Sequence, residues 1–107
     1  MFARITHFEI DTVRIGLGEA LERFKEMILP EVRKQPGYLG VYVLQTPEGK
    51  GALVSLWASK EAAQGGVESG YYDEQVAKFL MFTRQQPGRD HYEVVFAEGD
   101  RVEAKAP

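Results

Sequence analysis

Four stretches of this 107-residue chain have the residue pattern of β-strands. Residues 2–10 alternate between hydrophobic and polar positions and are rich in β-branched and aromatic side chains, which is typical of a half-buried strand. Residues 38–46 and 52–57 form two further predicted strands, and the short glycine-containing turn over 47–51 predicts that they pair as an antiparallel hairpin. Residues 91–97 form the last predicted strand.

The segment after the first strand has the spacing of a helix. Over residues 17–34 the hydrophobic positions recur every three or four residues, so they share one helical face. Gly18 is the expected N-cap. Pro30 is expected to kink this helix or to start a separate last turn before Gln35-Pro36-Gly37 ends it. The positions on the hydrophobic face are Leu17, Leu21, Phe24, Ile28 and Val32.

A second helical region follows the hairpin and is interrupted by glycines. Ser59 is expected to cap a short helix over residues 59–68. A second helix is predicted over residues 71–84, where Pro87-Gly88 follows its end. Its hydrophobic face would consist of Tyr72, Val76, Phe79, Leu80 and Thr83.

The order β-α-β-β-α-β predicts an α+β domain with the ferredoxin-like split β-α-β-β-α-β fold. Its antiparallel sheet would have the strand order 4-1-3-2, with both helices on one face. We assign this domain to residues 1–97 and expect residues 98–107 to form a flexible C-terminal tail. The second sheet face carries tyrosine, valine and leucine side chains without a cover. We therefore expect a second copy of the chain to pack on it about a two-fold axis.

Composition removes several classes of function. The chain has no cysteine, which excludes a disulfide scaffold, a thiolate nucleophile and a zinc–thiolate site. The net charge is −3 and the basic residues are scattered, which argues against nucleic acid as a partner. Lys50-Gly51 resembles the start of an RNA-recognition strand, but Ala52 and Val54 stand where bases would need aromatic rings. No stretch reaches the roughly 20 hydrophobic residues of a membrane span, and residues 1–7 show no leader, so we expect a cytoplasmic protein.

One hypothetical register of the outer strands would create a polar cluster. If His7 faces Glu93 across the sheet, antiparallel pairing also places Glu9 opposite His91. Two imidazoles and two carboxylates could then hold zinc or iron, or act as an acid–base pair. The alternative is cross-strand charge pairing at a dimer face or its rim, and no motif spacing supports the metal. The prediction is therefore no metal.

Trp57 ends the third strand and is the only tryptophan. Its indole N–H either finds a backbone acceptor in the core or points into a pocket and donates to a substrate. Tyr71 and Tyr72 follow glycines, and one of them could reach a ligand at the mouth of a pocket. Arg84 and Arg89 could neutralise an anion, although cations near a helix C-terminus are common without a function.

Three motifs together make the chain resemble the antibiotic biosynthesis monooxygenase family of the dimeric α/β-barrel superfamily. They are Gln35-Pro36-Gly37-Tyr38, the run over residues 55–62 (SLWASKEA), and the strand opening His91-Tyr92-Glu93-Val94. The resemblance covers roughly residues 2–97. It implies a homodimer whose two sheets face each other as a barrel, with a pocket between sheet and helices in each subunit.

The resemblance also implies an activity. Relatives include cofactor-free oxygenases of polyphenolic compounds, in which the deprotonated substrate supplies the electrons that reduce O₂, as well as quinol oxygenases and haem-degrading enzymes. Trp57 matches the family's tryptophan of the third strand, and the resemblance implies that Tyr71 or Tyr72 corresponds to its pocket tyrosine. Leu53 stands where some oxygenases carry an asparagine. The first strand lacks the asparagine and the region 59–83 lacks the histidine that haem degraders need.

From these residues we predict a homodimeric monooxygenase that needs no cofactor and oxidises a small aromatic or quinol-type molecule with O₂. Trp57 and Tyr72 would donate hydrogen bonds in the pocket, and His7 would accept a proton. Tyr71 and Arg84 would contact the substrate. The alternative is a non-catalytic ligand-binding or interaction dimer, which the missing asparagine favours.

Overall fold

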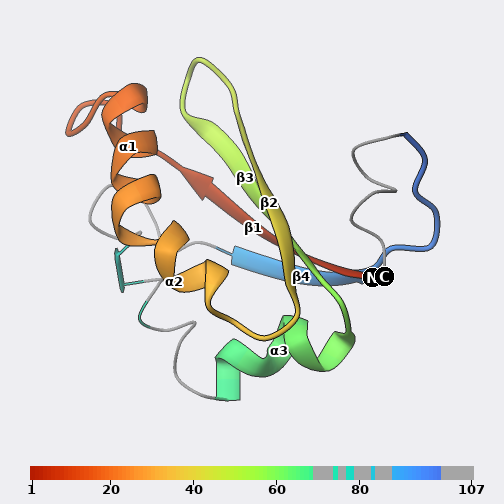
Figure 1. Cartoon of the computed structure of the whole chain (residues 1–107). Helices are drawn as coiled ribbons and strands as arrows, with labels where there is room; N and C mark the ends of the chain where they lie inside the picture. The colour runs from red at the N-terminus through yellow and green to blue at the C-terminus, as the bar shows by residue number, and fades with distance from the viewer. Residues whose placement is uncertain (69–73, 75–76, 79–82, 84–87, 100–107) are drawn as a thin grey trace.

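A four-stranded antiparallel sheet in the order β2-β3-β1-β4 lies at the centre of the fold (Figure 1). The strands are β1 (Phe2–Glu9), β2 (Tyr38–Gln45), β3 (Lys50–Trp57) and β4 (Gly88–Glu93). The computed structural model describes residues 1–68, 74, 77, 78, 83 and 88–99. Read from its other edge, the sheet has the predicted order 4-1-3-2, so the ferredoxin-like α+β fold is confirmed.

Three helices lie on the same side of this sheet (Figure 1): α1 (Leu17–Met27), α2 (Leu29–Arg33) and α3 (Lys60–Glu68). Pro30 stands in the first turn of the separate helix α2, as predicted, because a proline there lacks only an N–H that has no helical partner. The N-cap prediction is wrong. Gly16 caps α1 with an extended backbone and accepts a hydrogen bond from the Ala20 N–H at 2.9 Å, so Gly18 lies inside the first turn.

The second helical region is described only in part. Ser59 caps α3 as expected, because its Oγ accepts a hydrogen bond from the Ala62 N–H at 3.1 Å. Glu74, Ala77 and Lys78 are helical, and Thr83 pairs with Ile10 in an isolated β-bridge. The predicted helix end at residue 84 is therefore wrong. The rest of the predicted hydrophobic face (Tyr72, Val76, Phe79 and Leu80) lies outside the described residues.

Strand β4 begins and ends earlier than the predicted range 91–97. Its pairing partner explains the end: Glu93 lies opposite Phe2, and the Val94 N–H donates to the Met1 carbonyl at 2.9 Å. The side chains of Val95 and Phe96, which follow this bond, are 86% and 81% exposed.

The core fills the space between the sheet and the helices. It includes Phe24 and Ile28 of α1 and its C-cap, Val32 of α2, and Leu53 and Trp57 of β3. Directly paired residues share a face of an antiparallel sheet. The pairs Phe2–Trp57, Arg4–Ser55 and Thr6–Leu53 therefore all lie on the covered face.

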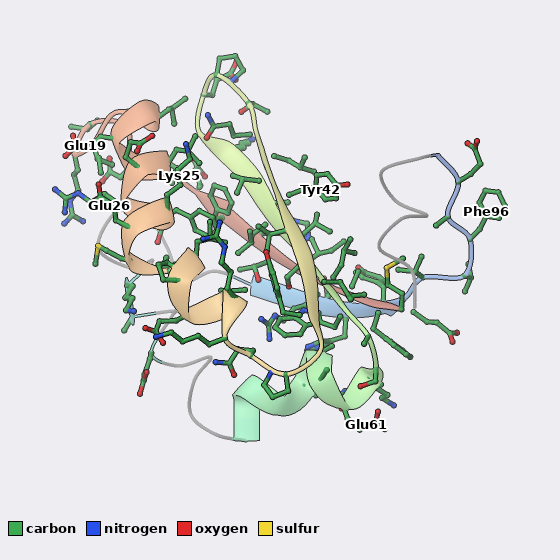
Figure 2. The ribbon with its side chains drawn as sticks, in the orientation of Figure 1. Glu19, Lys25, Glu26, Tyr42, Glu61 and Phe96 are labelled. Carbon is green, nitrogen blue, oxygen red and sulfur yellow. The ribbon has the colours of Figure 1, made fainter. Side chains whose placement is uncertain are left out.

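The opposite face, which we call the open face, is not covered by any of the three described helices. It carries Tyr42, Leu44 and Tyr92, whose side chains are 40%, 52% and 49% exposed. Figure 2 shows the Tyr42 side chain pointing away from α1. In the described part of the chain, every helix is too short or too polar to span a membrane.

Candidate functional site

Trp57 is 1% exposed and sits at the end of β3 beneath α3. Its Nε1–H donates a hydrogen bond of 2.9 Å to Ser55 Oγ, two residues earlier on the same face of the strand. The Tyr38 ring meets the indole edge-on, with centroids 6.1 Å apart. Of the two interpretations of Trp57, the position in the core is confirmed, but the acceptor of its N–H is the Ser55 hydroxyl and not a backbone carbonyl.

Arg4 is a second buried polar residue at this place and was missed by the sequence analysis. It is 6% exposed, and its guanidinium carbon lies 4.9 Å from the centre of the indole ring, in cation–π contact. Its Nη1 donates to the Ala63 carbonyl of α3 at 3.1 Å. The spacing along the strand contained the signal. Arg4 lies an even number of residues from Phe2, Phe8 and Ile10, which all face the helices, so its side chain is on the same face as theirs.

A cavity of about 400 Å³ lies between α3 and the neighbouring strands β1 and β4. We call it the α3 cavity. Lys60, Ala63 and Gln64 line it from α3, where spacings of three and four residues place them on one helical face. Phe2 and three consecutive residues of β4 form the other wall. The β4 residues are His91 and Glu93, whose side chains lie on this face, and Tyr92 between them, whose side chain lies on the open face.

The buried Arg4 adjoins this cavity on two sides. Ala63, whose carbonyl it binds, lines the cavity, and His91 lies directly opposite Arg4 in the β1–β4 pairing. A guanidinium and an imidazole thus stand on adjacent strands of the covered face. The positive charge of Arg4 therefore lies behind the cavity wall. The imidazole of His91, which can take up a proton, is part of the wall itself.

A second hollow lies under α1 and measures about 20 Å³. It is lined mainly by hydrophobic side chains, among them Phe8, Leu21 and Phe24. A single water needs about 10–15 Å³ measured in this way, so there is no room for an organic ligand. Of these two spaces, only the α3 cavity can hold a substrate.

The predicted cluster of His7, Glu9, His91 and Glu93 does not form. His7 pairs with Gly88 rather than Glu93, a difference of five residues in register. An odd shift reverses the face to which every side chain of a strand points. His7 and Glu9 therefore lie on the open face, whereas His91 and Glu93 lie on the covered one. Among the described residues, no group of three or more His, Asp or Glu side chains is placed to hold a metal ion.

The remaining predicted site residues are not brought together in the part of the chain that the structure describes. His7 is exposed on the open face opposite Ala52, while Trp57 lies on the covered face. One pocket within a single chain cannot contain both. Tyr71, Tyr72 and Arg84 lie outside the described residues, so their assignments as site residues stay predictions.

Solved structures with the same fold support this architecture. A monooxygenase from the gene ActVA-Orf6 of Streptomyces coelicolor, in complex with nanaomycin D, aligns with a TM-score of 0.69 and 15% identity over 92% of this chain and 91% of that one. Rv0793 from Mycobacterium tuberculosis aligns with a TM-score of 0.67 and 15% identity over 92% and 98% of the two chains. At these identities the likeness shows the fold alone.

A third structure binds a different ligand. A variant of MhuD with two manganese protoporphyrin IX molecules per active site aligns with a TM-score of 0.68 and 24% identity, over 94% of this chain and 100% of that chain. No protein with a curated description matches the chain in sequence. The profile of one family does match, over residues 5–78, which is more than half of the chain. The chain belongs to the antibiotic biosynthesis monooxygenase family.

Proposed function

We propose that this protein is a homodimeric, cofactor-independent monooxygenase that oxidises a small aromatic or quinol-type compound with O₂ in the α3 cavity. The observation that carries the proposal is the cavity of about 400 Å³ between α3 and β4. Binding sites for small molecules typically measure roughly 300–1,000 Å³. Membership of the monooxygenase family supports the class of reaction.

The chemistry requires little from the protein. A phenolic or anthrone-type substrate that loses a proton becomes an electron-rich anion able to reduce O₂. In an anthrone, the methylene carbon becomes a carbonyl, so one oxygen atom of O₂ enters the product and the other leaves as water. The substrate supplies the electrons. The protein has to exclude water, orient the ring and accept the proton.

In this proposal the proton acceptor is His91 rather than His7. His91 lines the α3 cavity, whereas His7 lies on the other face of the sheet. Trp57 also takes a different role from the one predicted, because its N–H is bound to Ser55. It supports Arg4 from behind the cavity wall. Tyr72 keeps its predicted role as a hydrogen-bond donor to the substrate.

Oxygen uptake with a panel of anthrones and quinols tests the reaction. We expect turnover by the purified wild-type protein. We expect at least a 100-fold lower kcat in His91→Gln, because positioned general bases typically contribute 10²–10⁴-fold. His7→Gln separates the two histidines. Absence of uptake with the whole panel contradicts the proposal, and so does a loss in His7→Gln that His91→Gln does not show.

The alternative function is a non-catalytic ligand-binding or interaction dimer. Two observations favour it. The indole N–H of Trp57 already has an acceptor inside the protein, and Leu53, at the position where some oxygenases carry asparagine, is 7% exposed in the core. Binding of an aromatic ligand without any oxygen uptake would support this alternative.

The homodimer in the proposal is expected to form through the open face. Replacing Tyr42 and Leu44 by lysine places two charges per subunit on that face. We expect the dimer dissociation constant to rise at least about 100-fold, because burying unpaired charges costs several kcal/mol. Analytical ultracentrifugation measures the change. Val13→Lys, at a side chain 87% exposed, is the control and should remain dimeric. A monomeric wild-type protein at tens of micromolar would contradict the prediction.

A further inference from the structure

We infer that the α3 cavity selects an aromatic compound of up to three fused rings that carries an ionised oxygen, with Lys60 as the charge partner of that oxygen. The inference rests on the proposed location of the substrate site. It does not depend on whether the bound compound is oxidised. It adds to the proposed function a limit on the size of the substrate and a required charge.

The size of the cavity sets the number of rings. Sites for small molecules typically measure roughly 300–1,000 Å³, so a cavity of about 400 Å³ lies near the lower end of that range. A compound of two or three fused rings with one polar substituent suits a site of that size. A tetrapyrrole has roughly three times as many non-hydrogen atoms as such a compound, and we expect it to bind weakly. The ligand we infer is therefore smaller than the porphyrin bound by MhuD.

The walls are divided between apolar and polar residues. Phe2 offers an aromatic ring for stacking, and Ala63 a small apolar surface. Lys60, Gln64 and His91 bring groups that bind oxygen atoms. A flat ring with a polar substituent at one end matches this division, whereas a purely hydrophobic ligand would leave the polar groups without partners.

The charges around the cavity favour an anion. Lys60 is the first residue of α3, at the positive end of the helix dipole, and its ammonium group forms none of the ion pairs found among the described residues. The buried Arg4 lies behind the same wall, bound to the Ala63 carbonyl. Glu93 lines the cavity from β4 and repels an anion. The ionised oxygen should therefore point towards α3.

Paired probes of similar size test the charge preference. We would measure binding to the full-length protein at pH 7.5 by calorimetry, comparing 2-naphthoate with neutral 2-naphthamide. A second pair, 2,4-dinitrophenolate and neutral 2,4-dinitroanisole, tests a phenolate against a carboxylate. We expect the ionised member of at least one pair to bind about 10-fold tighter than the neutral one, and that pair identifies the preferred oxygen.

Variants assign the preference to Lys60. Lys60→Gln should reduce the charge preference to about two-fold or less without changing the binding of the neutral probe. Glu93→Gln should tighten binding of the anion about two- to five-fold. Lys34→Gln, which removes the same charge from the C-cap of α2, should change neither. Protoporphyrin IX should bind at least 10-fold more weakly than the preferred anion.

The outcomes separate this inference from the proposed function. Charge-selective binding that depends on Lys60, without oxygen uptake, upholds the inference and overturns the oxidation. Equal affinity for charged and neutral probes, no effect of Lys60→Gln, tighter binding of the porphyrin, or no binding of either anion at millimolar concentration overturns the inference. Oxygen uptake with a neutral substrate that Lys60→Gln does not alter also overturns it, and leaves the oxidation standing.

Discussion

Replacing Trp57 by alanine is expected to lower the free energy of unfolding by about 3–5 kcal/mol, the usual cost of deleting a buried large aromatic ring. The ring is 1% exposed and lies between Arg4, Tyr38 and the hydrophobic core. Its loss leaves a cavity, removes the surface on which the guanidinium rests and leaves Ser55 without its donor. A small domain has only about 5–15 kcal/mol of stability in all, so the variant should unfold at far lower urea concentrations.

The measurement is urea unfolding followed by far-UV circular dichroism, because the variant no longer contains a tryptophan. Phe96→Ala is the control, since this ring is 81% exposed and should change stability by less than about 0.5 kcal/mol. Trp57→Phe keeps a ring but loses the bond from Nε1 and should cost about 1–3 kcal/mol. A loss below about 1 kcal/mol in Trp57→Ala would contradict the packing described for the core.

Gly37→Ala is expected to cost about 2–4 kcal/mol. Gly37 has a φ of +80°, where a side chain costs about 1–2 kcal/mol. A methyl group there would also lie 2.5 Å from Ala62 Cβ on α3, an overlap that costs about 1–3 kcal/mol. The Gly37 carbonyl in addition accepts a hydrogen bond of 2.8 Å from the Ala58 N–H, so the turn cannot move away freely.

Two variants separate the steric part of this cost from the backbone part. Ala62→Gly removes the opposing methyl group, so the double variant should show a favourable coupling of about 1–2 kcal/mol in a double-mutant cycle. Gly65→Ala, where an added Cβ meets nothing within 4 Å, should instead stabilise α3 by up to about 1 kcal/mol. Equal unfolding midpoints for Gly37→Ala and the wild type would show that the turn adopts another conformation.

The fold was predictable because each element carries a local signal. The hydrophobic spacing over 17–34, the proline at position 30 and the short turn at 47–51 act over a few residues and are each sufficient for one element. The register of β4 has no such local signal. Strand β4 follows a long connection rather than a tight hairpin, so nothing near it in the sequence fixes which of its residues pair with β1. An assumed register that differed by five residues was enough to create a cluster of two histidines and two glutamates that does not exist.

The site was predictable only in part for a similar reason. Trp57 stood out as the single tryptophan, but its acceptor was sought in the backbone or in a ligand rather than at Ser55, two residues away on the same face. Arg4 was overlooked because a charged residue in a strand is ordinarily expected to face solvent. Two observations show where Arg4 lies. The residues two positions away on the same strand face are turned towards the helices, and the Arg4 guanidinium binds the carbonyl of Ala63, which is 59 residues away in sequence.

The position of Trp57 has a practical consequence for spectroscopy. All tryptophan fluorescence of this protein comes from one ring, which is shielded from water and touches the cation that adjoins the α3 cavity. Unfolding would shift its emission to longer wavelength, whereas a ligand that displaces Arg4 would change its intensity while the ring stays buried. One emission spectrum can therefore distinguish loss of the fold from occupation of the cavity, without any label.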